Sequence, residues 1–164
     1  MRYSAGWASH LPTLIKVLQN SEGPVIEIGS GLFSTPVMHW LCQDSNRQLV
    51  TYEDHPTYYK WNKAFRSGTH ELVFVEDWDK IPLENQHWGV ALIDHNPPER
   101  RKIEIARLAD ITDFVIVHDT EPEMDIETNY IKDVFPLFKY HYQYTKGRPY
   151  TSVLSNFIDP STIL

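Results

Sequence analysis

The chain has 164 residues, a length that predicts one compact domain, 1–164, with its own hydrophobic core. Fifteen basic against 22 acidic residues give a formal charge of −7, and no basic stripe is present, which argues against a nucleic-acid partner. No apolar run approaches the roughly 20 residues of a membrane span, so no membrane partner is expected. The one cysteine, Cys42, excludes an intrachain disulfide framework and, as a weak indication, favours a cytoplasmic location.

The N-terminal region, residues 1–20, begins with an aromatic arm and continues into a helix. Leu11, Leu14, Ile15 and Leu18 follow the i, i+3, i+4, i+7 spacing of an amphipathic helix. The arm, residues 2–10, is open to two interpretations: a lid over a site, or a segment packed on the sheet.

Beyond residue 20, short apolar segments rich in β-branched residues alternate with helical patterns. The predicted strands are 25–28, 49–52, 72–75, 88–93 and 114–117, and the predicted helices begin near 36, 56, 99 and 125. The last of these helices is expected over 125–134, and the basic cluster 100–102 is expected on a solvated helix face. Two alternating aromatic runs, 138–145 and 150–156, predict a closing hairpin. Alternating strands and helices predict an α/β fold, a mostly parallel sheet covered on both faces.

The stretch 24–36 combines the first strand, a glycine turn and a helix start. Gly29 and Gly31 permit backbone geometry that a Cβ would block, and Ser34 or Thr35 is expected to cap the helix. A dinucleotide site normally has a third glycine, but position 34 is serine. Glu27, two residues before Gly29, would repel a pyrophosphate and attract an ammonium, which favours S-adenosylmethionine (SAM). A purely structural turn is the other interpretation.

Acidic and imidazole side chains follow the predicted strands directly. The residues in these positions are Glu53, Asp54, His55, Asp77, Asp94, His95, His118 and Asp119. In open parallel sheets, ligands bind beyond the carboxyl ends of the strands, so these side chains are expected around one site. This clustering is the main functional signal of the sequence.

On these residues the chain resembles the class I SAM-dependent methyltransferases, and most of all the small-molecule and sugar O-methyltransferases of the macrocin-type neighbourhood. The matching motifs are Glu-Ile-Gly-Ser-Gly at 27–31, Ile-Asp-His-Asn-Pro-Pro at 93–98 and His-Asp-Thr at 118–120. The resemblance covers about residues 24–156. It implies a Rossmann-like three-layer sandwich whose seven-stranded sheet has the order 3-2-1-4-5-7-6, with an antiparallel C-terminal hairpin.

The resemblance also implies roles for individual residues in binding SAM. The turn, with Gly29, Ser30, Gly31 and Thr35, would hold the methionine end, and Glu27 would act near its amino group. Glu53, with Asp54 beside it, would hold the ribose hydroxyls. Asp77 and Trp78 would flank the adenine, and Asp94 would lie nearest the sulfonium.

Four residues are the catalytic candidates: Asp94, His95, His118 and Asp119. Either His118 or His95 could take the proton of an acceptor hydroxyl, because an imidazole titrates near neutrality. Asp94, His118 and Asp119 could also hold a divalent metal. A histidine in place of an acidic ligand makes magnesium a poor match, because a hard cation prefers oxygen. A transition metal and a metal-free site both stay open.

The sequence thus predicts a SAM-dependent methyltransferase that methylates an oxygen of a small polar acceptor. Two alternatives are a nicotinamide-dependent oxidoreductase and a non-catalytic SAM-binding module. The aromatic edge strands leave a homodimer open.

Overall fold

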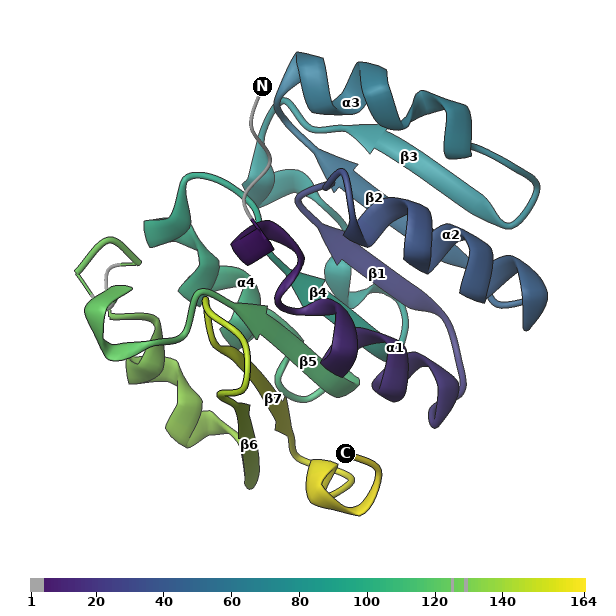
Figure 1. Ribbon diagram of the computed structural model, residues 1–164. Coiled ribbons are helices and arrows are strands. Elements are labelled where there is room, and N and C mark those ends of the chain that lie inside the picture. Colours follow the sequence, from purple (N-terminus) through teal and green to yellow (C-terminus); the bar gives the residue numbers. More distant parts are fainter. Residues whose placement is uncertain (1–4, 125, 129) are drawn as a thin grey trace.

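The computed structural model describes residues 5–124, 126–128 and 130–164, and one sheet runs through them (Figure 1). Its seven strands have the order β3-β2-β1-β4-β5-β7-β6, which confirms the expected fold. The strands are β1 (Val25–Ile28), β2 (Leu49–Glu53), β3 (His70–Phe74), β4 (Trp88–Ile93), β5 (Thr112–His118), β6 (Tyr140–Tyr144) and β7 (Thr151–Ser155).

The five strands from β3 to β5 in the sheet order are parallel, and the C-terminal hairpin is antiparallel. Ile28 in β1 pairs with Tyr52 in β2 and with Ile93 in β4, so these three strands end at one edge of the sheet. His118, the last residue of β5, pairs with Thr151 in the antiparallel strand β7. The parallel register therefore brings the polar residues that follow β1, β2 and β4 to the same side.

Helices cover both faces of the sheet. The α-helices are α1 (Leu11–Gln19), α2 (Ser34–Asp44), α3 (Pro56–Asn62) and α4 (Arg101–Leu108). Figure 1 shows α1 and α2 on the near face and α4 behind the sheet. Each face has a separate hydrophobic core, one containing Leu14, Met38 and Phe114, the other Ile28 and Ile105. Because both faces are covered, β1 and β4 are buried along their whole length, which explains why Glu27 is the one charged residue in these two strands.

The expected capping of α2 is wrong. Phe33 occupies the N-cap and makes no side-chain capping bond, whereas Ser34 and Thr35 are the first two residues of the helix. The Thr35 hydroxyl instead donates to the buried carboxylate of Glu27. The Thr35 hydroxyl is therefore engaged by Glu27, beneath the turn, and does not cap the N-terminus of α2.

The helix expected over 125–134 is also wrong. Positions 125 and 129 lie outside the described residues. Tyr130 has a left-handed backbone with φ of 55°, which no α-helix continues through. A 3-10 helix follows at Ile131–Leu137 and contains Pro136, whose ring is incompatible with an α-helix interior.

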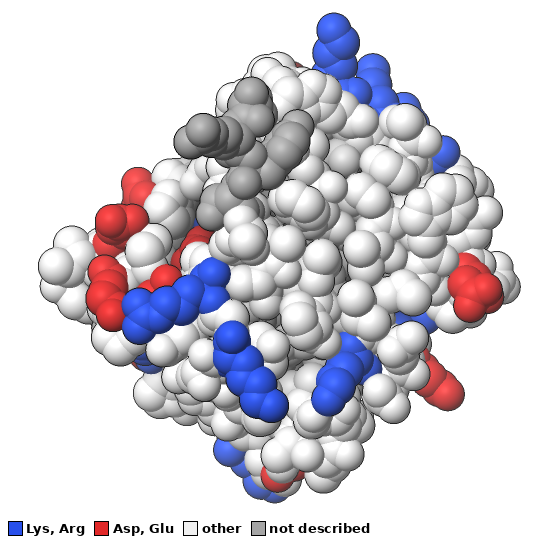
Figure 2. All heavy atoms as spheres, viewed as in Figure 1, with Lys and Arg blue, Asp and Glu red and all other residues white. Residues whose placement is uncertain are grey.

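Charged side chains are spread over the face seen in Figure 2, where Lys and Arg stand among wide neutral areas.

In the described part of the chain, no helix is both long and apolar enough to cross a membrane.

Candidate functional site

A cavity of about 740 Å³ opens at the carboxyl ends of the parallel strands. This volume lies within the roughly 300–1,000 Å³ of ligand pockets. The polar residues that line it are His10, Ser30, Ser34, Glu53, Asp54, His55, Tyr58, Asp94, His95, Asn96, Arg101, His118 and Asp119. Trp7 also lines it, so the described part of the N-terminal arm reaches the cavity; residues 2–4 of the expected lid lie outside the described residues.

The glycine turn forms one wall, and only a glycine fits at its first position. Gly29 has a φ of +91°, and a Cβ there would stand 2.5 Å from the backbone N and Cα of His95. The N–H of Gly31 is not available to a ligand, because it donates to Thr35 Oγ1 at 2.9 Å. The turn thus packs directly on the segment that follows β4, and it leaves the Ser30 side of the loop facing the cavity.

Glu27 lies beneath the turn, fully buried and outside the cavity lining. Its carboxylate accepts hydrogen bonds from the hydroxyls of Thr35 and Thr51. Burial raises the pKa of Glu27 to about 7, although these hydroxyls oppose the shift. Glu27 therefore changes its charge near neutral pH, one layer below the surface that a ligand would touch.

Glu53, at the end of β2, does line the cavity, and it fixes the turn from the other side. Its carboxylate accepts from the backbone N–H and the hydroxyl of Ser30, each at 2.7 Å, and from the N–H of His55 at 2.7 Å. Burial raises the pKa of this carboxyl, which the three hydrogen bonds counteract. A carboxylate has about four lone-pair sites, so one acceptor position remains.

The two residues that the resemblance places beside the adenine lie outside the lining of the cavity. Trp78 is buried, and its indole N–H donates to Asp54 Oδ2 at 3.1 Å. Asp77 accepts from the backbone of Asp79 and forms an exposed ion pair with Lys80. Of this group only Asp54 reaches the cavity.

Arg101 binds the two aspartates that follow β4 and β5. Its guanidinium contacts Asp94 Oδ1 at 3.1 Å and Asp119 Oδ2 at 2.9 Å. Burial alone would raise the pKa of Asp94, but Arg101 and His118 hold it well below its usual range. The expectation of a solvated helix face is therefore wrong for Arg101, whose side chain is 4% exposed.

His118 lies between these carboxylates and the N-terminal segment. Its Nδ1 is 3.4 Å from Asp94 Oδ2 and 3.5 Å from Asp119 Oδ1. Its Nε2 is 2.9 Å from the hydroxyl of Ser9, which donates to the carbonyl of Pro149 at 2.7 Å. Burial lowers the pKa of His118, but the two aspartates more than offset this effect, and the net shift is upward.

His95 is placed differently from the other catalytic candidates. Its side chain is fully buried, with Nε2 3.2 Å from Glu104 Oε2 on α4. The ring also packs on Trp78, with 4.6 Å between centroids. The backbone of His95 packs against Gly29 and so helps to shape the turn, whereas its imidazole lies on the α4 side.

His10 is a cavity residue that the sequence reasoning missed. It lies just before α1, is 1% exposed, and forms an edge contact with the His118 ring at 4.8 Å between centroids. Neither ring nitrogen has a hydrogen-bond partner within the described residues. Burial lowers the pKa of His10 to about 4, so the ring is neutral at physiological pH. No local pattern marks this histidine, because only packing of the arm brings it to the strand ends.

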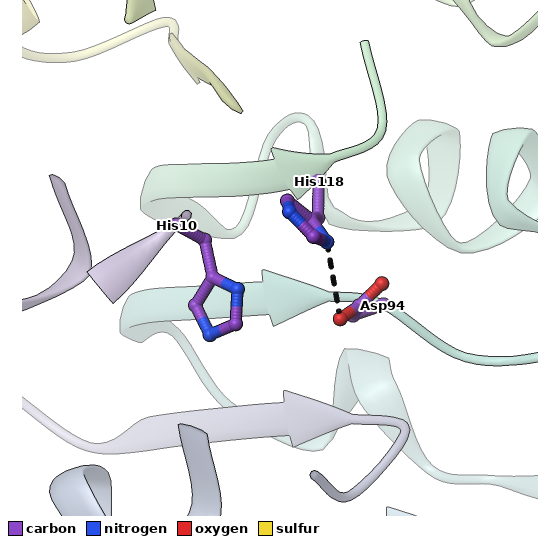
Figure 3. A group of neighbouring side chains, drawn as sticks. All are labelled: His10, Asp94 and His118. Carbon is purple, nitrogen blue, oxygen red and sulfur yellow. Dashed lines mark ion pairs between the residues drawn. The ribbon is translucent and has the colours of Figure 1, made fainter. Parts of the chain in front are cut away.

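Figure 3 shows how His10, Asp94 and His118 converge from three separate segments. One potential ligand atom from each lies within 4.8 Å of the other two. The sequence predicted Asp119, together with Asp94 and His118, as a possible metal ligand, and that stays a prediction. Asp119 and Asp94 each have one oxygen paired with Arg101.

No protein-family model matches the sequence, and no curated protein does. Solved structures are similar throughout the chain. An O-methyltransferase from Bacillus cereus, in complex with SAH (S-adenosylhomocysteine), is 13% identical, with a TM-score of 0.66 over 94% of this chain and 82% of that one. Human methyltransferase-like protein 13, also with SAH, is 14% identical, with a TM-score of 0.67 over 95% and 85%. Spermidine synthase from Thermotoga maritima is 15% identical, with a TM-score of 0.63 over 90% and 57%.

The chain therefore has the fold of the class I SAM-dependent methyltransferases. A spermidine synthase shares this fold, so the fold alone does not define the reaction.

Proposed function

We propose that this protein binds SAM in the cavity and transfers its methyl group to an oxygen of a small polar acceptor. The observation that carries the proposal is the cavity itself, built by the Gly29–Gly31 turn at the carboxyl edge of a methyltransferase-type sheet. The SAH-bound structures with the same fold support this choice of ligand.

The charge of the cavity favours SAM over a nicotinamide dinucleotide. Glu53, Asp54, Asp94 and Asp119 all line it, and Arg101 pairs with only the last two. SAM brings a sulfonium and an ammonium, which such a wall attracts. A pyrophosphate would meet the carboxylates of Glu53 and Asp54, which accept hydrogen bonds but have no ion-pair partner among the described residues. The negative charge of the cavity therefore favours a SAM-dependent methyltransferase over a nicotinamide-dependent oxidoreductase.

Within this proposal, the methionine end of SAM packs against the cavity-facing backbone of the turn at 29–31, whose Gly31 N–H and Ser30 donors are already bonded to the protein. Glu27 and Thr35 support the turn from below. The remaining acceptor position of Glu53 takes a ribose hydroxyl, with Asp54 beside it. Asp77 and Trp78 would reach the adenine only if the loop after β3 rearranged, so Asp54 and Tyr58 are the better candidates at that end.

The acceptor would lie on the opposite side, toward the ends of β4 and β5. Methyl transfer is an in-line displacement, and alignment of the reacting atoms supplies much of the acceleration. Asp94 and Asp119 orient the acceptor hydroxyl as hydrogen-bond acceptors, and its proton passes to the carboxylate that holds it as the O–CH₃ bond forms and the bond from sulfur to the methyl carbon breaks. His118 keeps the two carboxylates in place. His95 supports the turn through its backbone, while its buried imidazole lies beside Glu104 on α4.

Calorimetric titration with SAM, SAH and NADH tests the proposal. We expect SAM and SAH to bind and NADH not to bind. Glu53→Gln should weaken SAM binding by about tenfold or more, because it removes a charged acceptor that is worth roughly 1.5–3 kcal/mol. Glu71→Gln, on the exposed side of β3, is the matched control and should bind normally. Absence of SAM and SAH binding at millimolar concentration would refute the proposal.

A mass-spectrometric screen of hydroxyl-bearing acceptors separates an enzyme from a non-catalytic module. An enzyme gives a product about 14 mass units heavier, because a methyl group replaces the hydroxyl hydrogen, and Asp94→Asn slows its formation. A binding module gives SAM binding without any product. The absence of a nucleic-acid partner and the formation of a homodimer stay predictions.

A further inference from the structure

We infer that His10, Asp94 and His118 form a binding site for a divalent transition-metal ion, with His10 as the ligand that the N-terminal segment contributes. The metal site stands on the geometry of these side chains and does not depend on SAM binding. Three observations carry it: the orientation of His118, the charge of the buried cluster, and the two nitrogens of His10.

The hydrogen bonds of His118 define which nitrogen faces the cluster as a ligand. Ser9 gives its single hydroxyl proton to the Pro149 carbonyl, so its oxygen can only accept from His118 Nε2–H. This arrangement resembles that of metal-binding histidines, which donate their second ring N–H to a nearby oxygen. Nδ1 is then the atom aimed at Asp94 and Asp119.

The charges around Nδ1 call for a cation in this position. With neutral histidines, the two carboxylates of Asp94 and Asp119 face the single guanidinium of Arg101, which leaves one negative charge unbalanced in a largely buried cluster. A proton on Nδ1 would provide one unit of charge. However, the 3.4 and 3.5 Å separations of Nδ1 from the two carboxylates exceed the 2.7–2.9 Å of a short charge-assisted hydrogen bond.

The separation of His118 Nδ1 from Asp94 Oδ2 suits a shared metal ion. Two ligand atoms that each lie about 2.1 Å from a tetrahedral ion stand roughly 3.4 Å apart. The pair is 3.4 Å apart in the structure. Asp94 Oδ1 is held by Arg101, which fixes the carboxylate so that Oδ2 faces the histidine.

His10 distinguishes a metal from a proton. A proton shared by His118 and Asp94 leaves both nitrogens of the buried His10 without a partner among the residues that the structure describes, which is costly. A metal ion between the three side chains would use the nearer nitrogen of His10 as its third ligand. That nitrogen lies within 4.8 Å of the other two ligand atoms, so it must approach them by at most about 1.4 Å to reach the roughly 3.4 Å separation of ligands on a tetrahedral ion.

The ligand set selects the class of ion. Two imidazole nitrogens and one carboxylate oxygen match Zn²⁺, Fe²⁺ or Co²⁺, whereas Mg²⁺ prefers oxygen ligands and water. When bound, such an ion would polarise an acceptor hydroxyl at its open positions, a role that rests on the proposed methyl transfer.

Titration of the metal-stripped protein with Co²⁺, in the absence of SAM, tests the site. We expect one equivalent to bind with a visible d–d absorption band, Zn²⁺ to displace it, and millimolar Mg²⁺ to leave it unchanged. His10→Phe keeps a buried ring and should weaken binding at least about tenfold. His87→Phe, at an exposed histidine paired with Asp113, is the control and should bind as the wild type does.

Equal Co²⁺ binding by the wild type and His10→Phe would mean an adventitious ion only, and would overturn the inference. So would the absence of binding to the wild type. If His10→Phe fails to fold, as judged by circular dichroism, His118→Asn provides the same comparison. Because the titration contains no SAM, a negative result leaves the methyltransferase proposal intact, and loss of SAM binding leaves the metal site intact.

Discussion

The buried carboxyl of Glu27 leads to a quantitative prediction for stability. Its pKa is raised from 4.5 to about 7 in the folded protein, and an unfolded chain restores the ordinary value. Between these two values the folded state holds a proton that the unfolded state has released, so the free energy of unfolding falls as the pH rises. A shift of roughly 2.5 units corresponds to about 3 kcal/mol.

Glu27→Gln should remove this dependence, because an amide has the shape of the neutral carboxyl and no charge to bury. The Gln variant should match the wild type within about 1 kcal/mol near pH 4.5. It should become more stable than the wild type by about 3 kcal/mol above pH 7. The groups that face Glu27 are the hydroxyls of Thr35 and Thr51, Ser34, and the nearby carboxylate of Glu53.

Urea denaturation of both proteins from pH 4.5 to 8 measures the difference, in which titrations of other groups cancel. A matched variant, Thr51→Val, takes away one hydrogen bond to the ionised carboxylate. In this variant the pKa of Glu27 should rise further, so the free energy of unfolding should keep falling up to a higher pH than in the wild type. A difference between wild type and Glu27→Gln that is constant across this range would refute the reasoning.

Two further predictions concern the walls of the cavity. Gly29→Ala should destabilise the fold by about 1–3 kcal/mol or more, because a positive φ and a clash with the His95 backbone oppose a Cβ there. Gly68→Ala is the control, since a Cβ at that position meets nothing within 4 Å. Equal denaturation midpoints for the two variants would contradict the clash. Arg101→Leu should cost about 3 kcal/mol, because it leaves two largely buried carboxylates without their cation. Adding Asp94→Asn to Arg101→Leu should recover part of the loss in thermal unfolding, and a further loss would show that the ion pairs are not the cause.

The sequence alone was sufficient to predict the architecture. Strand positions follow from β-branched apolar runs, and the order of the sheet followed from the family resemblance carried by the motifs at 27–31, 93–98 and 118–120. The polar residues after each strand could be placed at one edge because parallel strands end together. Glu53, Asp94, His118 and Asp119 therefore line one cavity, as the sequence pattern indicated.

Only the tertiary structure decided what each of these side chains does. Glu27 and His95 belong to the same motifs as their neighbours, but one lies beneath the turn and the other faces α4. His10 and Arg101 look ordinary in the sequence, and packing brings both to the aspartates. Strand periodicity is a local property that the sequence records directly, whereas the direction, burial and partners of a side chain depend on segments distant along the chain.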